Sequence, residues 1–316
     1  MRFHVCRKRF ARRFAGIAVS SVLLLQAGCG PQEYQKPIQQ FQDATAVVVN
    51  ATRAFLNNMN LIEQNRALDE AVFEKKSIDL STLDKVKIIS PEEIKIRTDA
   101  LEILAQYTSN LAQLAQGKAG SDVGDSTTKL SNSLKTLAND AKKLPGGVFD
   151  NAKFSGIANS AANIIGDVAQ LIVQHKARHE IELSLEKTDP AVTALIQQIS
   201  DDATAAYLRQ KNQLGAYGSQ LSRDYELELR ANPDPILLLG FANTIKNYRV
   251  QQAQLAQANP AAAINEMKKA HEALVAYARS KETPKNLHEL ITAVENFANS
   301  VKPLGQAVQA LISNAA

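Results

Sequence analysis

Apolar side chains recur every three or four residues along most of the chain, which is the period of an amphipathic α-helix. The first seam alternates steps of four and three residues: Phe41, Thr45, Val48, Thr52, Phe55, Met59 and Ile62. Leucine seams follow within residues 101–114 and 130–144. No comparable stretch alternates apolar and polar residues, so strands are not expected. The pattern predicts an all-α fold whose helices pack lengthwise, in the manner of a coiled coil.

Five helix starts are marked by a capping residue followed by proline: Ser90-Pro91, Asp189-Pro190, Asp234-Pro235, Asn259-Pro260 and Thr283-Pro284. Proline suits the first helical position because its missing N–H would have no helical partner there, and the preceding side chain can accept a bond from a free backbone N–H. The pair at 189–190 therefore predicts a turn at Thr188-Asp189. That turn would separate a long helix over about 152–187 from another reaching about residue 231.

Breaks between the helices are predicted at residues 76–89, which lack a clear period, and at the glycines of 117–125 and 145–147. The links are short, so neighbouring helices should run antiparallel in an elongated up-and-down bundle. We expect this helical bundle domain to cover residues 37–316, with a possible sub-boundary near residue 147 or 232.

The N-terminus has the layout of a secretory signal. Residues 1–14 hold six basic residues and no acidic one, and the next 11 residues, 15–25, carry no charge. A membrane-spanning helix needs about 20 apolar residues. The run is therefore too short to span comfortably.

The stretch LQAGC at residues 25–29 resembles a bacterial lipoprotein signal, in which an aliphatic residue and two small residues precede the lipid-bearing cysteine. Ala27, Gly28 and Cys29 match its last three positions, whereas Gln26 departs from the first. The resemblance implies a signal over residues 1–28, lipidation at Cys29 and a short tether over 29–36. It places the protein in the bacterial cell envelope, and Gly30 favours the outer membrane, facing the periplasm. An ordinary secretory signal cut after Gly30, or an uncleaved anchor, is the alternative.

Removal of the signal changes the charge and the cysteine count. The chain has 36 basic and 32 acidic residues, and loss of the six basic residues of the signal leaves 30 against 32, a formal net charge of −2. No basic domain survives, so a nucleic-acid partner is not expected. Cys6 leaves with the signal, so Cys29 has no partner for an internal disulfide. Stability must come from helix packing.

Histidines supply the only metal candidates. His175 and His179 stand four residues apart on one helical face, but Lys176 occupies the position where a zinc protease carries its glutamate. Two ligands from one helix are not a site unless another helix completes them. His271 and His288, each followed by glutamate, are expected on the surface. With no nucleophile turn and no phosphate loop, the sequence predicts neither an enzyme nor a cofactor.

Two apolar stripes are candidate contact surfaces. The tyrosines at 207, 217 and 225 have helical spacing and are expected to form a packing seam. The residues Ile236, Leu237, Leu238, Leu239 and Phe241 follow a double proline break and are apolar all round. Such a helix is normally buried. The alternative is a membrane-inserting element or an exposed partner patch.

The sequence therefore predicts a lipid-anchored helical protein of the cell envelope that acts without catalysis, through contacts with an unidentified envelope protein, as a spacer, adaptor or assembly factor. Two alternatives stay open. A membrane-acting bundle, similar in outline to helical pore formers, would insert residues 236–241. A metal- or ligand-binding periplasmic protein would use His175 and His179.

Overall fold

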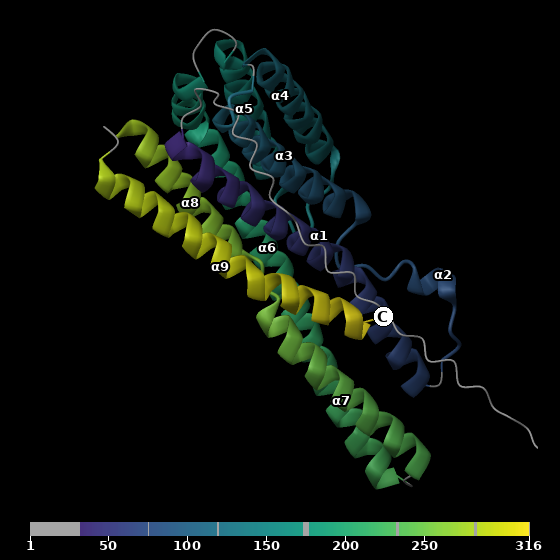
Figure 1. The fold of residues 1–316 in the computed structure, drawn as a ribbon. Coiled ribbons are helices and arrows are strands. Elements are labelled where there is room, and N and C mark those ends of the chain that lie inside the picture. Colours follow the sequence, from purple (N-terminus) through teal and green to yellow (C-terminus); the bar gives the residue numbers. More distant parts are fainter. Residues whose placement is uncertain are drawn as a thin grey trace, which may run out of the picture.

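The computed structural model describes residues 32–74, 76–118, 120–172, 177–231, 234–280 and 283–315. Within these ranges the chain forms nine α-helices and no strand, which confirms the predicted all-α fold. The helices are α1 (Gln32–Phe73), α2 (Leu80–Leu83), α3 (Pro91–Ala115), α4 (Gly120–Lys143), α5 (Asn151–Ile172), α6 (Ala177–Ala231), α7 (Pro235–Gln257), α8 (Ala261–Arg279) and α9 (Pro284–Ala315). Figure 1 shows that they form an elongated bundle, with the short α2 at its side.

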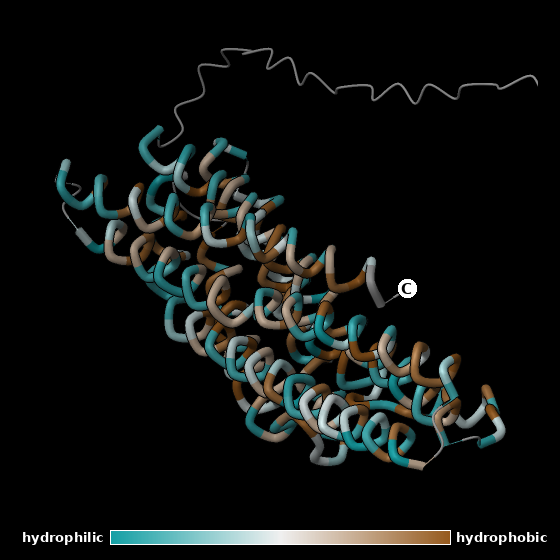
Figure 2. Tube along the Cα trace, turned by 90° about the horizontal axis from the view of Figure 1, so that it is seen from below, coloured by the Kyte–Doolittle hydropathy of each residue, from teal (hydrophilic) through white to brown (hydrophobic). Residues whose placement is uncertain are grey.

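Helices that follow one another along the chain pack side by side through most of the bundle. α4 packs against α3 and α5, α5 against α6, and α8 against α9. α1 packs against both α3 and α9, and α6 contacts α3, α5, α7 and α8. Hydrophobic and hydrophilic positions interleave along the helices (Figure 2), as expected when each helix buries one face. The helical bundle is confirmed, while a coiled-coil register stays a prediction.

The predicted seam of α1 lies entirely in the core: all of its residues from Phe41 to Ile62 are buried. The main core also contains Phe154 of α5 and Phe297 of α9, both fully buried. These helices are far apart in the sequence, so the core is closed by long-range packing of their apolar faces.

Four of the five predicted helix starts are confirmed. In each, the side chain before the proline accepts a hydrogen bond from a backbone N–H of the first turn: Ser90 from Glu93 at 3.1 Å, Asp234 from Ile236 at 2.9 Å, Asn259 from Ala261 at 3.0 Å and Thr283 from Asn286 at 3.3 Å. At the first of these, the Glu93 carboxylate also accepts from the Ser90 N–H at 3.2 Å, which completes a capping box.

The predicted turn at Thr188-Asp189 is wrong. α6 begins at Ala177 and runs unbroken through Pro190, whereas α5 ends at Ile172. Proline inside a helix removes one backbone hydrogen bond. Fully buried residues on both sides, including Leu185 and Leu195, hold the helix in the core despite this loss. The Asp189 carboxylate bonds Arg279 at 3.0 Å rather than capping a helix, so tertiary contacts override the local signal.

α1 begins earlier than predicted. It begins at Gln32, within the segment 29–36 expected to be a tether, and contains Pro37. Tyr34 and Ile38, both fully buried, pack this first part onto the bundle. The linker between α3 and α4 is shorter than the predicted 117–125, because α4 already begins at Gly120.

The crossing of α6 and α7 depends on one glycine. A Cβ added at Gly218 would lie 2.2 Å from Cζ of Tyr248 on α7, whereas a Cβ at Gly215, also on α6, would meet nothing within 4 Å. Tyr248 also packs edge-on against Tyr217, with ring centroids 6.4 Å apart. The tyrosine ring therefore fixes how closely the two helices approach.

We expect Gly218→Ala to lower the free energy of unfolding by about 1–3 kcal/mol, because the tyrosine ring must shift out of its packing. Gly215→Ala is the matched control and should raise stability by up to about 1 kcal/mol, because alanine is the better helix former. Urea denaturation followed by circular dichroism compares the two. Equal effects of both substitutions would show that α6 and α7 are not in close contact at Gly218.

Candidate interaction site at the end of α6 and α7

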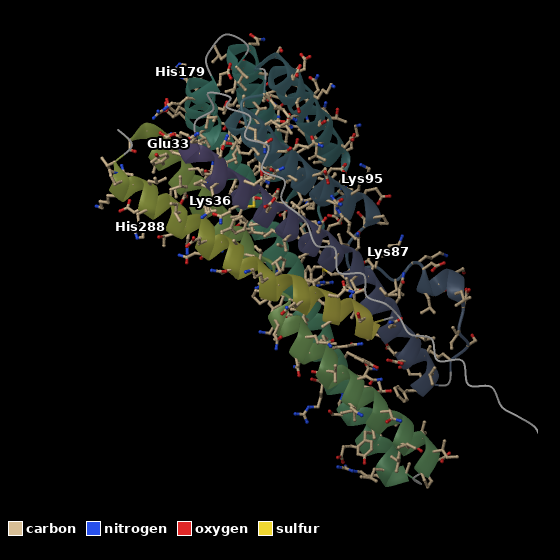
Figure 3. The ribbon with its side chains drawn as sticks, in the orientation of Figure 1. Glu33, Lys36, Lys87, Lys95, His179 and His288 are labelled. Atoms are coloured by element: carbon tan, nitrogen blue, oxygen red, sulfur yellow. The ribbon has the colours of Figure 1, made fainter. Side chains whose placement is uncertain are left out.

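Of the residues predicted to carry chemistry, only some lie in the described part of the chain. Cys29 and His175 lie outside it. His179 is exposed in the first turn of α6, at the same end of the molecule as Glu33 (Figure 3). Among the described residues, no three histidine, cysteine, aspartate or glutamate side chains are grouped so that they could hold a metal ion.

A buried ion pair lies where α3, α5 and α6 meet. Arg97 is 1% exposed and donates from Nε to Asp202 at 2.9 Å and from Nη1 to Asn151 at 2.6 Å. Its guanidinium also lies 4.2 Å from the ring centroid of Phe149 and 4.9 Å from that of Phe154. Burial lowers the pKa of Arg97 and raises that of Asp202, while their mutual attraction opposes both shifts. The cluster ties three helices together and has a structural role.

His271 was expected on the surface, and this prediction is wrong. The ring is fully buried among Phe41, Tyr107 and Asp189, with Nε2 3.8 Å from the Asp189 carboxylate. Desolvation lowers the pKa of His271 to about 4, although Asp189 pulls in the opposite direction. The imidazole is therefore neutral near pH 7. Because the side chain is fully buried in contact with the main core, it is a core residue that titrates.

The far half of α6 and the first half of α7 pack against each other as a pair that we call the arm, residues 217–231 and 235–248. Its small core contains Tyr217, Leu221 and Phe241, separate from the main core. The last residue of α1, Phe73, stacks on Phe241 with centroids 4.0 Å apart and planes 10° apart. The predicted tyrosine seam is confirmed as a packing seam. In Figure 1 the arm extends beyond the ends of α8 and α9.

The apolar stretch 236–241 lies at the end of this arm, and the expectation that it is buried is wrong for most of it. Ile236 is 82% exposed and Leu239 63% exposed, Leu237 and Leu238 are half-buried, and Phe241 alone is buried. At the start of α7, Leu237 and Phe241 pack into the small core shared with α6 and the end of α1, while Ile236 and Leu239 face solvent. We call Leu227, Leu229, Ile236 and Leu239, all exposed, the apolar tip.

An open groove runs between the end of α1 and the arm. Five apolar residues belong to its lining, and we call this apolar part the floor: Phe73, Leu227, Ala231, Leu237 and Phe241. Three carboxylates complete its lining, Glu74, Asp224 and Glu228. Asp224 and Glu228 are half-buried and stand one turn apart on α6. The groove thus combines an apolar floor with an acidic rim.

None of the described helices has both the length and the apolarity needed to cross a membrane. Comparisons of the chain with protein-family models, with curated proteins and with solved structures give no match.

Phe73 is the member of this site that the sequence analysis missed, and the sequence does carry a signal for it. The predicted seam of α1 ends at Ile62. The same steps of four and three continue from there through Arg66 and Asp69 to Phe73. Charged residues at the two intermediate positions hid this continuation. In the structure both are partly buried where α1 meets the arm, and Asp69 accepts a hydrogen bond from Tyr217 at 3.0 Å.

Proposed function

We propose that this chain is a lipid-anchored helical protein of the bacterial cell envelope that acts without catalysis, by holding a protein partner at the end of its arm. The observation that carries the proposal is the apolar tip. Exposed large apolar side chains can mark a contact surface, and four of them lie on the last turns of α6 and the first turns of α7, at the end of this helix pair. The lipoprotein-like sequence at residues 25–29 supports the anchoring half of the proposal.

The position of α1 supports a partner that lies away from the bilayer. Gln32 follows Cys29 by three residues, and Glu33 lies 3.5 Å from Arg178 in the first turn of α6. The apolar tip is at the other end of α6, which has 55 residues and is therefore about 80 Å long. A lipid on Cys29 would hold the first end at the membrane and direct the tip away from it.

Anchoring is tested by Cys29→Ser. We expect the wild type to incorporate labelled fatty acid and to sediment with membranes, and the variant to lose both properties, because stable attachment depends on the acyl chains. Membrane fractionation after palmitate labelling measures this. An unlabelled wild type would contradict the lipoprotein interpretation.

The contact role is tested separately, with a photo-crosslinking amino acid at Ile236 in intact cells. We expect a discrete adduct with another protein, and we expect Leu239→Asp to remove it. A role in membrane disruption is the competing outcome, because an apolar tip also suits a bilayer. Dye leakage from liposomes that Leu239→Asp abolishes, without any protein adduct, would favour that role.

A further inference from the structure

We propose that the groove beside the apolar tip binds a basic amphipathic helix of the partner protein. This inference rests on the proposed contact function and deepens it by naming the chemistry of the segment that is bound. The apolar side chains of the bound helix would cover the floor of the groove. The lysine or arginine side chains of that helix would face the carboxylates of the rim.

The floor supplies the apolar half of the recognition. The stacked rings of Phe73 and Phe241 both line the groove and join α1 to α7 there. Leu227, which is 66% exposed, and the half-buried Leu237 add apolar side chains from α6 and α7 to the same lining. Grooves of this kind take up the apolar face of a helix, whose side chains recur every three to four residues.

The rim supplies the charge complementarity. Asp224 and Glu228 are four residues apart on α6, and like charges at this spacing destabilise a helix. The described residues provide no ion pair for either of them, since Arg230 instead contacts Glu226 at 3.5 Å. Glu74 pairs with Lys76, and no lysine or arginine is among the described residues that line the groove. Two cations one turn apart on a bound helix would match this pair of carboxylates.

Other occupants suit the groove less well. An anionic lipid surface would meet the carboxylates of the rim with like charge. A second copy of this chain that docked by its own arm would bring an identical set of carboxylates to the same place. A helix with basic residues beside its apolar face satisfies both halves of the site.

The test uses the full-length chain in its own membranes, with a photo-crosslinking amino acid at Leu227. Two biotin-labelled synthetic helices serve as probes, one of leucine and lysine and the other of leucine and glutamate. We expect the lysine peptide to be captured and the glutamate peptide not. The double substitution Asp224→Asn with Glu228→Gln should reduce capture about tenfold, because two ion pairs are lost.

Two controls separate the groove from general attraction to an acidic protein. Glu226→Gln removes a carboxylate of α6 outside the groove and should leave capture unchanged. A photo-crosslinker at Val250, which is exposed on α7 and does not line the groove, should capture little of either peptide.

Equal capture of both peptides, or capture unaffected by the double substitution, would overturn this inference. A crosslinked dimer of the chain would also overturn it, because it would assign the groove to a second copy. A cellular adduct from Ile236 that persists in the double variant would overturn the groove as the binding site while sparing the contact function. Absence of that adduct would contradict the contact function itself.

Discussion

Arg97→Ala is expected to lower the free energy of unfolding by about 3–5 kcal/mol, because it leaves the buried carboxylate of Asp202 without its cation. The side chain of Asp202 is 5% exposed, and its remaining side-chain partner is Gln198, which donates at 2.9 Å. The substitution also removes the guanidinium from between two phenylalanine rings. Urea denaturation followed by circular dichroism suits this chain, which has no tryptophan for a fluorescence signal.

Lys95→Ala provides the matched control on the same helix. Lys95 also pairs with an aspartate, Asp99, but its side chain is 73% exposed. Its loss should cost less than about 1 kcal/mol. Replacing both buried partners, with Arg97→Met and Asp202→Leu, should recover much of the loss because no uncompensated charge remains. A small effect of Arg97→Ala alone would mean that water reaches the ion pair.

His271 should make the protein less stable as the pH falls below about 6.5. The imidazole has a pKa of about 4 in the folded protein, against 6.5 when it is free of these surroundings. Between these values the unfolded chain binds a proton that the folded chain does not, so acid favours unfolding. The free energy of unfolding should fall by about 2 kcal/mol between about pH 7 and about pH 5 from this residue. Denaturation curves across this range measure the slope.

His271→Gln should remove that slope, whatever its effect on stability at neutral pH. His288→Gln is the control, because His288 is exposed on α9 (Figure 3) and its substitution should leave the slope in place. Most carboxylates change the free energy of unfolding at lower pH. Comparing the slopes of the two variants above about pH 5 therefore isolates the contribution of the histidine. An unchanged slope in the His271 variant would show that the ring is accessible to water when the protein is folded.

The features that the sequence predicts well are those with local causes. A capping side chain and the proline beside it lie in one turn, so Ser90 and Asp234 identify their helix starts without knowledge of the rest of the fold. The seam from Phe41 to Ile62 is equally local, since its spacing places every member on one face of α1.

The predictions that fail are those decided by distant segments. Pro190 stays inside α6 because neighbouring helices bury the residues on either side of it. Ile236 is 82% exposed within an apolar stretch, because burial depends on which distant segments pack there, and the composition of the stretch cannot reveal this. His271 could have been placed correctly, because it follows Met267 by four residues and precedes Val275 by four, and both of these are core residues.

The continuity of α6 from the bundle into the arm has a mechanical consequence. Hinge motions are absorbed by a few residues in loops or at the ends of elements. On the α6 side, the bundle and the arm are joined by unbroken helix. On the α7 side they are joined by unbroken helix as well, because α7 continues beyond the arm to Gln257 and its Leu255 is buried in the main core. Neither connection is a free joint, so the arm would act as a rigid lever. A load applied at its end would turn the whole bundle rather than fold the arm back.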